Sequence, residues 1–413
     1  MCIRDRPGIV IPLDSPGVIA YHTALPVSVT PSSEDRTVKF EIQQEALQKA
    51  LDLVAGVVPG KTTLPILKSI LVEASGASLR FSVTNLDISM VTATDDVEIG
   101  AEGKAAVPAD KLVGFVRSLA PGSVKVEIES GKVSIRAGKA SLQESCMNAE
   151  EYPALPDLAA ADGLTVPGDL LATMFAETSY AVSRDETRPA LMGILWEVSP
   201  DGLTMVATDA HRLARSRRSF DWSVGEERSM IVDTGGLRHL PRIAAQADDD
   251  SPVELFLGEN QLSFRASQTV LHTRLLEGPF PDYNAVLPKG NDKIVTVDRE
   301  VLGQAIRRVS ITADRITSQI RLGLEEDRLE LSAKGSDGSR AEDEVAVGYA
   351  GDAMEIGFNY NYLLDILKNV KANNVQLSLR DAQSAVLIAP ADEDGEADPS
   401  LLCLLMPLRL AGD

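Results

Sequence analysis

The sequence ILVEASGASLRFSVTNLD, residues 70–87, occurs in similar form twice more in the chain. The related stretches are ILWEVSPDGLTMVATDAH at residues 194–211 and IRLGLEEDRLELSAKGSD at residues 320–337. Each has the pattern of a strand, an acidic or glycine-containing turn and a second strand. The leucines that follow the three turns, Leu79, Leu203 and Leu329, are 124 and 126 residues apart. This period is the size of a folding domain, so the chain is predicted to contain three tandem copies of one domain.

The rest of each copy repeats in the same order. A short strand leading into a helix is predicted from Ala105, Met230 and Met354, and two more strands around a turn are predicted from Val124, Val253 and Val375. A further helix opens each copy. We therefore predict an α+β fold in which every domain has two helix-plus-strands halves. The expected domains are residues 38–160, 161–286 and 287–413.

Two segments lack any helical or alternating period. Residues 1–37 contain five prolines and are interpreted as a disordered or non-native N-terminal extension. The segment PADEDGEADPS, from Pro390, has the composition of a solvated hairpin tip between two strands.

Composition limits the class of protein. With 413 residues and 44% hydrophobic content the chain can bury several ordinary cores. Three scattered cysteines, Cys2, Cys146 and Cys403, are too few for a disulfide framework, which favours a reducing, cytoplasmic location. No apolar run has the length that a membrane span needs, so no membrane association is expected.

Positive charges recur on the predicted helices although the net charge is −21. The helix predicted over Thr234–Ala247 contains Arg238, His239 and Arg242 and no acidic residue. The other cations on or beside predicted helices are Lys111, Arg117, Arg184, Arg188, Arg307, Arg308, Lys368 and Lys371. Their recurrence indicates one cationic surface on an acidic body, suited to a polyanion. The alternative is that these are ordinary solvated helix faces.

Four segments carry a family resemblance: TTLPILKSILVE at residues 62–73, ATDAHRLA at 207–214, EGPFPDYNAVLP at 277–288 and MPLRL at 406–410. Together they resemble the bacterial DNA polymerase III beta subunit, the sliding clamp, in order from about Lys39 to Leu410. The resemblance implies a head-to-tail homodimer, in which each chain supplies half of a closed ring around double-stranded DNA. It also implies a replication processivity factor without catalysis or cofactors of its own. The implied partners are the replicative polymerase's catalytic subunit, the clamp loader and other repair polymerases and proteins.

The resemblance also assigns site residues by position. It adds Lys61 to the candidate DNA contacts, together with Arg184 and Arg188. A ring held on DNA by topology needs only weak phosphate contacts that do not read bases. Dimer contacts are implied around Leu142 and Ile311, through edge strands. The walls of a pocket for a short hydrophobic partner peptide are implied to be Leu191, Thr208, His211, Arg212, Leu213, Pro281, Val286, Asn359, Tyr362, Met406, Pro407, Leu408 and Arg409.

The chain departs from the family pattern at three places. Ala210 stands where a glycine is usual before the histidine, and Ala285 stands where an arginine is frequent. Residues 411–413 extend past the usual end. These departures bear on the affinity for partner peptides and on the range of partners.

The residues alone leave other interpretations open. The segment AGVVPGKT, from Ala55, is close to a phosphate-binding loop but begins with alanine and follows a helix. Asp209 and His211 could belong to a hydrolase, but no motif supplies a nucleophile. MPLRL could be a buried last strand. A repeat-built, β-rich binding module that does not encircle DNA is the alternative function, and it would not need basic helix faces.

Overall fold

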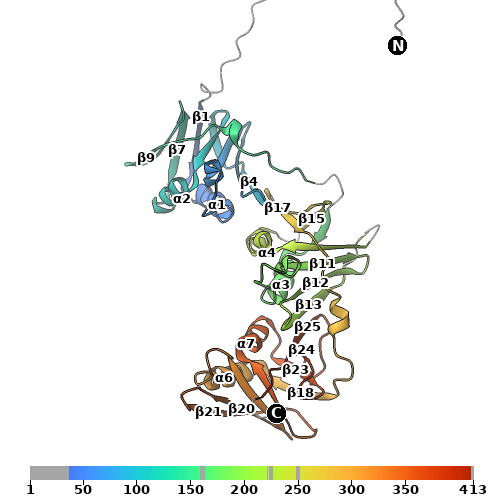
Figure 1. Ribbon diagram of the computed structural model, residues 1–413. Helices are drawn as coiled ribbons and strands as arrows, with labels where there is room; N and C mark the ends of the chain where they lie inside the picture. The colour runs from blue at the N-terminus through green and yellow to red at the C-terminus, as the bar shows by residue number, and fades with distance from the viewer. Residues whose placement is uncertain (1–36, 159–162, 221, 223–226, 248–251, 411–413) are drawn as a thin grey trace, which may run out of the picture. The chain divides into compact units, whose positions relative to one another are not determined.

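The computed structural model describes residues 37–158, 163–220, 222, 227–247 and 252–410. The expectation for residues 1–37 therefore lies outside the described residues, except at Thr37. Of the described chain, three successive groups of elements make up three domains (Figure 1).

The first domain contains two helices and nine strands. Its elements are β1 (Val38–Gln43), α1 (Gln44–Ala55), β2 (Ser69–Ser75), β3 (Ser78–Thr84), β4 (Ile88–Thr94), β5 (Val97–Ala101), β6 (Gly103–Pro108), α2 (Ala109–Ser118), β7 (Ser123–Glu129), β8 (Lys132–Ala137) and β9 (Ala140–Ser145).

Among its described residues, the second domain has the same order of elements without a counterpart of β5, and α4 and α5 together take the place of α2. Its elements are β10 (Leu164–Val166), α3 (Gly168–Ser179), β11 (Gly193–Ser199), β12 (Gly202–Thr208), β13 (Arg212–Arg218), β14 (Arg228–Asp233), α4 (Thr234–Leu237), α5 (Leu240–Ala244), β15 (Val253–Leu257), β16 (Gln261–Ala266) and β17 (Thr269–Leu276).

The third domain repeats this order. Its elements are β18 (Lys293–Asp298), α6 (Arg299–Ser310), β19 (Gln319–Glu325), β20 (Arg328–Lys334), β21 (Arg340–Ala346), β22 (Met354–Asn359), α7 (Tyr360–Asn369), β23 (Asn374–Leu379), β24 (Val386–Ala391) and β25 (Leu401–Leu405). The connection between β24 and β25 contains the acidic segment that was predicted to be a hairpin tip.

The helices form because their apolar residues recur at helical spacing. In α1, Leu47, Leu51 and Val54 are buried, whereas Lys49 on the opposite side is exposed. In α6, Arg307 is likewise exposed while Leu302 and Ile306 are buried. Helices pack in pairs, α1 with α2, α3 with α5 and α6 with α7. Their apolar faces join the strands in one core.

One predicted helix is wrong in its extent. The sequence predicted a single helix over Thr234–Ala247, but the structure has two short helices, α4 and α5, separated at Arg238 and His239. Pro241 lies in the first turn of α5. Because proline has no backbone N–H to donate to the preceding turn, the helix starts again there.

In each domain the two halves exchange their first strands, so each sheet combines strands from both halves. The first strand of the second half joins the three later strands of the first half, giving the orders β6-β2-β3-β4, β14-β11-β12-β13 and β22-β19-β20-β21. The first strand of the first half joins the three strands of the second half, giving β1-β7-β8-β9, β10-β15-β16-β17 and β18-β23-β24-β25. The three domains thus share one topology, as the sequence repeats predicted.

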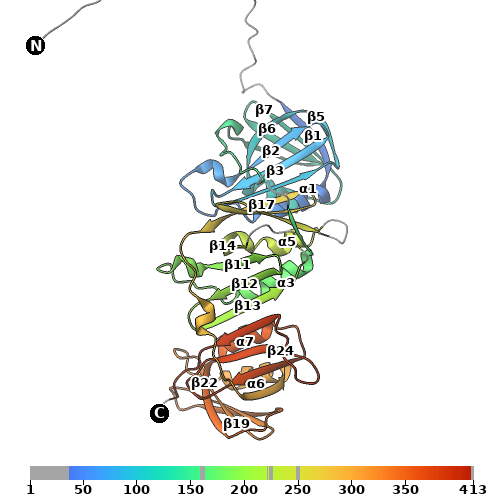
Figure 2. The same cartoon turned by 90° about the vertical axis from the view of Figure 1, so that its right-hand side faces the viewer.

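Two of these sheets continue from one domain into the next, at strands labelled in Figure 1; Figure 2 shows the same chain turned by 90°. At the first seam β4 pairs with β17, so the end of a first half meets the end of a second half. At the second seam β13 pairs with β25 in the same way. The two remaining strands of this kind are β21 and β9. Among the described residues each pairs on one side only, with β20 and β8 respectively.

Candidate functional site

The second seam is organised by the turn Thr208–Arg212, between β12 and β13. The Thr208 hydroxyl donates to the Arg212 carbonyl at 2.7 Å and accepts from the Ala210 N–H at 3.2 Å. The Asp209 carboxylate accepts from the N–H groups of His211 and Arg212 at 2.9 and 3.0 Å. Threonine and aspartate side chains thereby reinforce the turn, which the Asp209 N–H also closes by donating to the Arg212 carbonyl at 3.3 Å.

Arg212 joins the second and third domains. Its guanidinium donates to Asp209 at 3.1 Å, to Asp365 of α7 at 2.6 Å and to the Tyr180 carbonyl at 2.7 Å. It also lies over the Tyr362 ring, 4.4 Å from the centroid. Since Arg212 is only 8% exposed, these partners replace the water that the charge has lost.

A second buried contact lies at the same seam. The Tyr180 hydroxyl and the Cys403 sulfur are 3.1 Å apart. Burial raises the pKa of the Cys403 thiol to about 12 and also raises the pKa of Tyr180, so both groups remain protonated and uncharged at neutral pH.

The structure brings His211, Tyr362 and the segment Met406–Arg409 together. The rings of His211 and Tyr362 stack with centroids 6.2 Å apart. The Met406 N–H donates to the His211 carbonyl at 2.9 Å, and the Leu408 N–H donates to the Gly357 carbonyl at 2.8 Å. Met406 is 42% exposed. MPLRL is thus neither a strand nor a buried core segment, since β25 ends at Leu405.

The connection after β17 covers the outer face of the second domain. Phe280, Tyr283 and Leu287 pack on a cluster that contains Leu213. Val286, in the same segment, is 57% exposed, and Pro281 is exposed. Leu191 is buried in a short 3-10 helix, Pro189–Met192, and Asn359 caps α7 by accepting from the Asn361 N–H at 2.9 Å.

Ala210 explains why a glycine is usual at its position. Its φ is +75°, in the left-handed region that costs a residue with a Cβ atom about 1–2 kcal/mol. Ala285, the second departure, lies in the 3-10 helix Tyr283–Val286.

Half of the predicted DNA-contact residues are exposed cations that pair with no carboxylate among the described residues. They are Lys61, Lys111, Arg184, Arg307 and Lys368. Lys61 follows α1, Lys111 lies on α2, Arg184 follows α3, and the other two lie on α6 and α7.

The other five predicted DNA contacts have protein partners. Arg117 pairs with Asp52 at 2.6 Å, Arg188 with Asp185 at 2.8 Å and Arg308 with Asp343 at 2.6 Å. Arg238 and Arg242 donate to backbone carbonyls near the end of α1, Gly56 at 3.4 Å and Asp52 at 3.2 Å. Cations beside the carbonyl end of a helix stabilise its dipole, so these two arginines also join the first and second domains.

Between these arginines, His239 is buried. Burial, followed by the charges of Arg238 and Arg242, lowers the pKa of His239 to about 4. The Arg238 guanidinium lies 3.2 Å from the His239 Nε2 atom and can donate to it when the ring is neutral.

The predicted dimer residues occupy different kinds of element. Leu142 lies on β9, an edge strand, as expected. The stretch around Ile311 is not a strand: Ile311 follows the last residue of α6, and its side chain is 83% exposed. The edge strand of the third domain is β21, on which α6 packs.

Within the described ranges, no group of three or more His, Cys, Asp or Glu side chains is arranged to hold a metal ion. No helix in that part of the chain is long and apolar enough to cross a membrane.

Sequence reasoning missed several partners of the named residues. Asp209 could have been found, because an aspartate three residues before an arginine at a turn commonly pairs with it. Asp365 and Tyr180 are 153 and 32 residues from Arg212, and only the fold brings them together.

Comparisons with known proteins agree with this architecture. Residues 38–156, 165–282 and 284–408 match the family models described as the N-terminal, central and C-terminal domains of the DNA polymerase III beta subunit. The beta sliding clamp of Pseudomonas putida is 33% identical over 372 residues, covering 90% of this chain and 100% of the relative. The beta sliding clamp of Escherichia coli K12 is 32% identical over 373 residues, with the same coverage.

Solved clamp structures have the same fold. A sliding clamp from Pseudomonas aeruginosa bound to griselimycin superposes with a TM-score of 0.84 at 32% identity, covering 90% of this chain and 100% of the other. The C. crescentus beta sliding clamp, with polyethylene glycol bound to a putative beta-motif tethering region, gives 0.84 at 29% identity, covering 91% and 100%.

Three tandem clamp domains and these matches define a replication accessory protein. The chain belongs to the bacterial DNA polymerase III beta subunit family, the sliding clamps. The resemblance inferred from the four segments is thereby confirmed, and so is the interpretation as a processivity factor whose partners perform the catalysis. The alternative of a repeat-built, β-rich binding module that does not encircle DNA is not supported.

Proposed function

We propose that two copies of this chain pair head to tail through β21 of one copy and β9 of the other, closing a ring around double-stranded DNA. The pairing pattern of the last strands carries this proposal. Three strands end a first half, β4, β13 and β21, and three end a second half, β9, β17 and β25. If each strand of the first set pairs with one strand of the second set, three pairs form. Two of them, β4 with β17 and β13 with β25, are present within the chain. The third pair, β21 with β9, would need a second copy of the chain. In a dimer, β21 of each copy can pair with β9 of the other, so no edge of this kind is left unpaired.

The charges of the two edges support this pairing. Lys132, Arg136 and Lys139 are exposed on or beside the hairpin of β8 and β9. Glu342 and Glu344 are exposed on β21, where they pair with Arg340 and Arg328 of the same chain. Opposite charges on facing strands favour the pair and disfavour pairing of like edges. The proposed interface includes Leu142 and the exposed Ile311, whose apolar side chain would lose water there.

Inside the ring we propose weak phosphate contacts by Lys61, Lys111, Arg184, Arg307 and Lys368. Their cations have no competing carboxylate among the described residues. Arg117, Arg188, Arg238, Arg242 and Arg308 would add to the positive field while keeping their protein partners. Few, sequence-independent contacts suit a protein that slides.

At the second seam we propose a pocket for a short peptide of the replicative polymerase's catalytic subunit, the clamp loader and repair polymerases. Its walls would be the thirteen residues that the resemblance assigned, from Leu191 to Arg409. The contacts among His211, Tyr362 and Met406 support it, because they set an adaptable thioether and two rings beside polar groups able to fix a peptide backbone. We also propose the domain limits 38–160, 161–286 and 287–413, and work in the cytoplasm, where bacterial DNA is replicated.

Retention on plasmid DNA tests the ring. The protein is loaded on circular plasmid with a clamp loader and ATP, at salt that suppresses ordinary phosphate binding, and the plasmid is then cut once. Retention on the circle and rapid loss after cutting are expected for a topological link. Equal loss from both forms would contradict ring closure.

Two variants assign the interface. Leu142→Asp and Ile311→Asp should each give monomers in sedimentation analysis and abolish retention on circles. Leu86→Asp, a matched change of an exposed leucine outside the proposed interface, should leave the dimer intact. Deleting residues 406–410 should abolish binding of a partner peptide while the dimer persists; unchanged binding would contradict the pocket.

A further inference from the structure

The first seam repeats the backbone of the second seam. At the turn Thr84–Ile88 the Thr84 hydroxyl accepts from the Leu86 N–H at 3.0 Å and donates to the Ile88 carbonyl at 3.1 Å. Asn85 accepts from the N–H groups of Asp87 and Ile88 at 3.1 and 2.7 Å. These are the hydrogen bonds of Thr208–Arg212, position by position. Leu86, with φ of +83°, corresponds to Ala210.

The strand beside the turn corresponds as well. The Arg274 N–H donates to the Asp87 carbonyl at 3.0 Å, as the Met406 N–H does to the His211 carbonyl. Two residues later Leu276 pairs with Ile231 of β14, as Leu408 bridges to Gly357 of β22. Arg274, Leu276 and Glu277 therefore occupy the places of Met406, Leu408 and Arg409.

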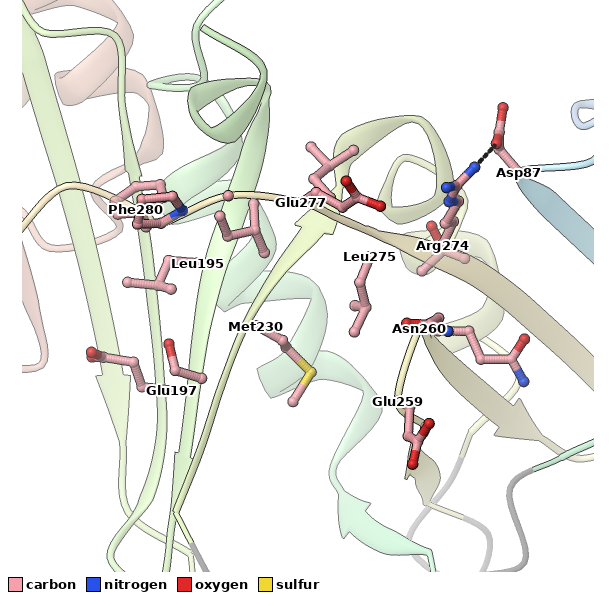
Figure 3. A pocket seen from close by; sticks show the side chains of 18 of the residues that line it. Asp87, Leu195, Glu197, Met230, Glu259, Asn260, Arg274, Leu275, Glu277 and Phe280 are labelled. Atoms are coloured by element: carbon pink, nitrogen blue, oxygen red, sulfur yellow. Dashed lines mark ion pairs between the residues drawn. The ribbon is translucent and has the colours of Figure 1, made fainter.

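A large cavity opens at this first seam. It has a volume of about 1210 Å³ and is lined by the turn at Leu86 and Asp87, the end of β17, the hairpin between β15 and β16, and the connection from Glu277 to Asn284 (Figure 3). That connection, which leads from the second domain into the third, forms one wall of the cavity. This volume is above the range of roughly 300–1,000 Å³ for sites that hold small ligands, and it is large enough for several side chains.

The cavity has an acidic rim. Among its described lining residues the ionised side chains are five carboxylates and one guanidinium, Arg274. The Asp87 carboxylate and the Arg274 guanidinium lie 3.6 Å apart, and both side chains are about 60% exposed. Their ion pair is therefore weak. Glu259 and Glu277 are exposed and have no ion-pair partner within the described ranges. Where the second seam has His211 and Arg409, the first has Asp87 and Glu277.

Apolar side chains lie between the acidic groups. Leu195, Met230, Leu275 and Phe280 line the cavity together with Glu197, Glu259 and Glu277 (Figure 3). Leu86 at the mouth is 59% exposed. Leu195 and Met230 are buried, so the accessible apolar surface comes from Leu86, Leu275 and Phe280. These side chains beside a carboxylate rim complement a chain that alternates apolar and cationic residues.

We propose that this cavity is a second docking pocket, which takes a partner peptide carrying apolar residues flanked by lysine or arginine. It goes beyond the function proposed above, because it lies at the other seam. The two pockets share a backbone frame but differ in the charges at corresponding positions, with Asp87 and Glu277 at the first seam and His211 and Arg409 at the second. One chain could then hold two kinds of partner at once.

A selection experiment tests the proposal. The full-length dimer lacking residues 406–410 is used to select from a random dodecapeptide library displayed on phage. Enriched peptides are synthesised with a fluorophore, and their affinity for the intact protein is measured by fluorescence anisotropy. The expected peptides carry apolar residues between lysines or arginines, and their binding weakens as salt is raised.

Substitutions in the cavity test whether the selected peptides bind there. Glu259→Lys with Glu277→Lys should weaken binding about tenfold, since two exposed attractions become repulsions. Leu86→Asn removes the apolar side chain at the mouth while suiting the positive φ, and should weaken binding severalfold. Glu326→Lys with Glu393→Lys makes the same charge change at exposed sites in the third domain and should have little effect.

Three results would overturn the proposal. Recovery of no peptide, of acidic peptides only, or of peptides whose affinity survives the charge reversal would each do so. These results leave plasmid retention and peptide binding at the second seam untouched, so failure here is distinguishable from failure of the clamp function.

Discussion

The two seams have the same backbone frame and different side-chain contents. At the second seam a buried arginine, Arg212, is surrounded by Asp209, Asp365 and the Tyr362 ring. At the first seam the corresponding residue is Ile88, 3% exposed, with a neutral Asn85 before it.

The neighbouring helices differ accordingly. Asp233 directly precedes α4, and Asn359 directly precedes α7. Gly236 and Tyr362 lie three residues further along their helices, so they occupy corresponding positions. A Cβ atom at Gly236 would lie 2.2 Å from the Thr273 hydroxyl, so only glycine fits there. The comparison teaches that threonine and Asx hydrogen bonds fix the frame, while the positions around it are free to become apolar or ionic.

The largest effect that separates the seams is expected from Arg212→Leu. It leaves the carboxylate of Asp209, whose side chain is 14% exposed, without its cation and the Tyr180 carbonyl without its donor. Removing one partner of a buried pair should lower the free energy of unfolding by about 3 kcal/mol. Fluorescence of Trp196 and Trp222 in urea measures it. The matched change Ile88→Val should cost about 1 kcal/mol; equal losses at both seams would contradict the comparison.

Acid should destabilise the first seam through His239. Its pKa in the folded chain, about 4, is below the ordinary value near 6.5, so the unfolded chain binds the proton first. The contribution is complete above pH 6.5 and declines as the pH falls toward 4, by about 2 kcal/mol between pH 6.5 and 5. His239→Gln should flatten this part of the curve of unfolding free energy against pH. An unchanged slope would refute it.

The turn that both seams share predicts a smaller effect, a gain in the free energy of unfolding when its strained residue becomes glycine. Ala210→Gly and Leu86→Gly remove a Cβ atom at φ of +75° and +83°. Relief of about 1–2 kcal/mol exceeds the extra backbone entropy of the unfolded chain, about 0.4–1 kcal/mol. Each variant should therefore be about 0.5 kcal/mol more stable in urea. A gain at one seam and a loss at the other would show that the turns are not equivalent.

The smallest effect is expected from Arg274→Ala. Its pair with Asp87 spans 3.6 Å and both side chains are exposed, so its loss should cost less than about 0.5 kcal/mol. A larger loss in the same urea experiment would mean that the first seam also depends on an ion pair.

Much of this architecture could be predicted from the sequence. The repeats at Leu79, Leu203 and Leu329 gave three domains of one topology because alternation and helical spacing are local properties. The extent of the helix at Thr234 could not be predicted from its apolar spacing, since Pro241 and the close approach of Gly236 to Thr273 decide it.

The candidate sites were predictable in part. The residues of the second seam were named through family resemblance, and the structure adds the ionic partners from α3 and α7. The cavity at the first seam had no sequence signal, because Leu86, Met230 and Glu277 become neighbours only after β4 pairs with β17. The partners of Arg238 and Arg242 were missed for the same reason.

The paired strands at the seams also determine how the chain responds to force. Each seam joins five residue pairs in register, and such strands cannot slide past one another without breaking the ladder. A change in angle between neighbouring domains must be taken up as extra twist, which sheets tolerate over a range of about 25° per strand pair. Twist spread over several strands stores elastic energy and returns it when the load is released. The seams therefore resist sliding of one domain past the next more strongly than twisting about the paired strands.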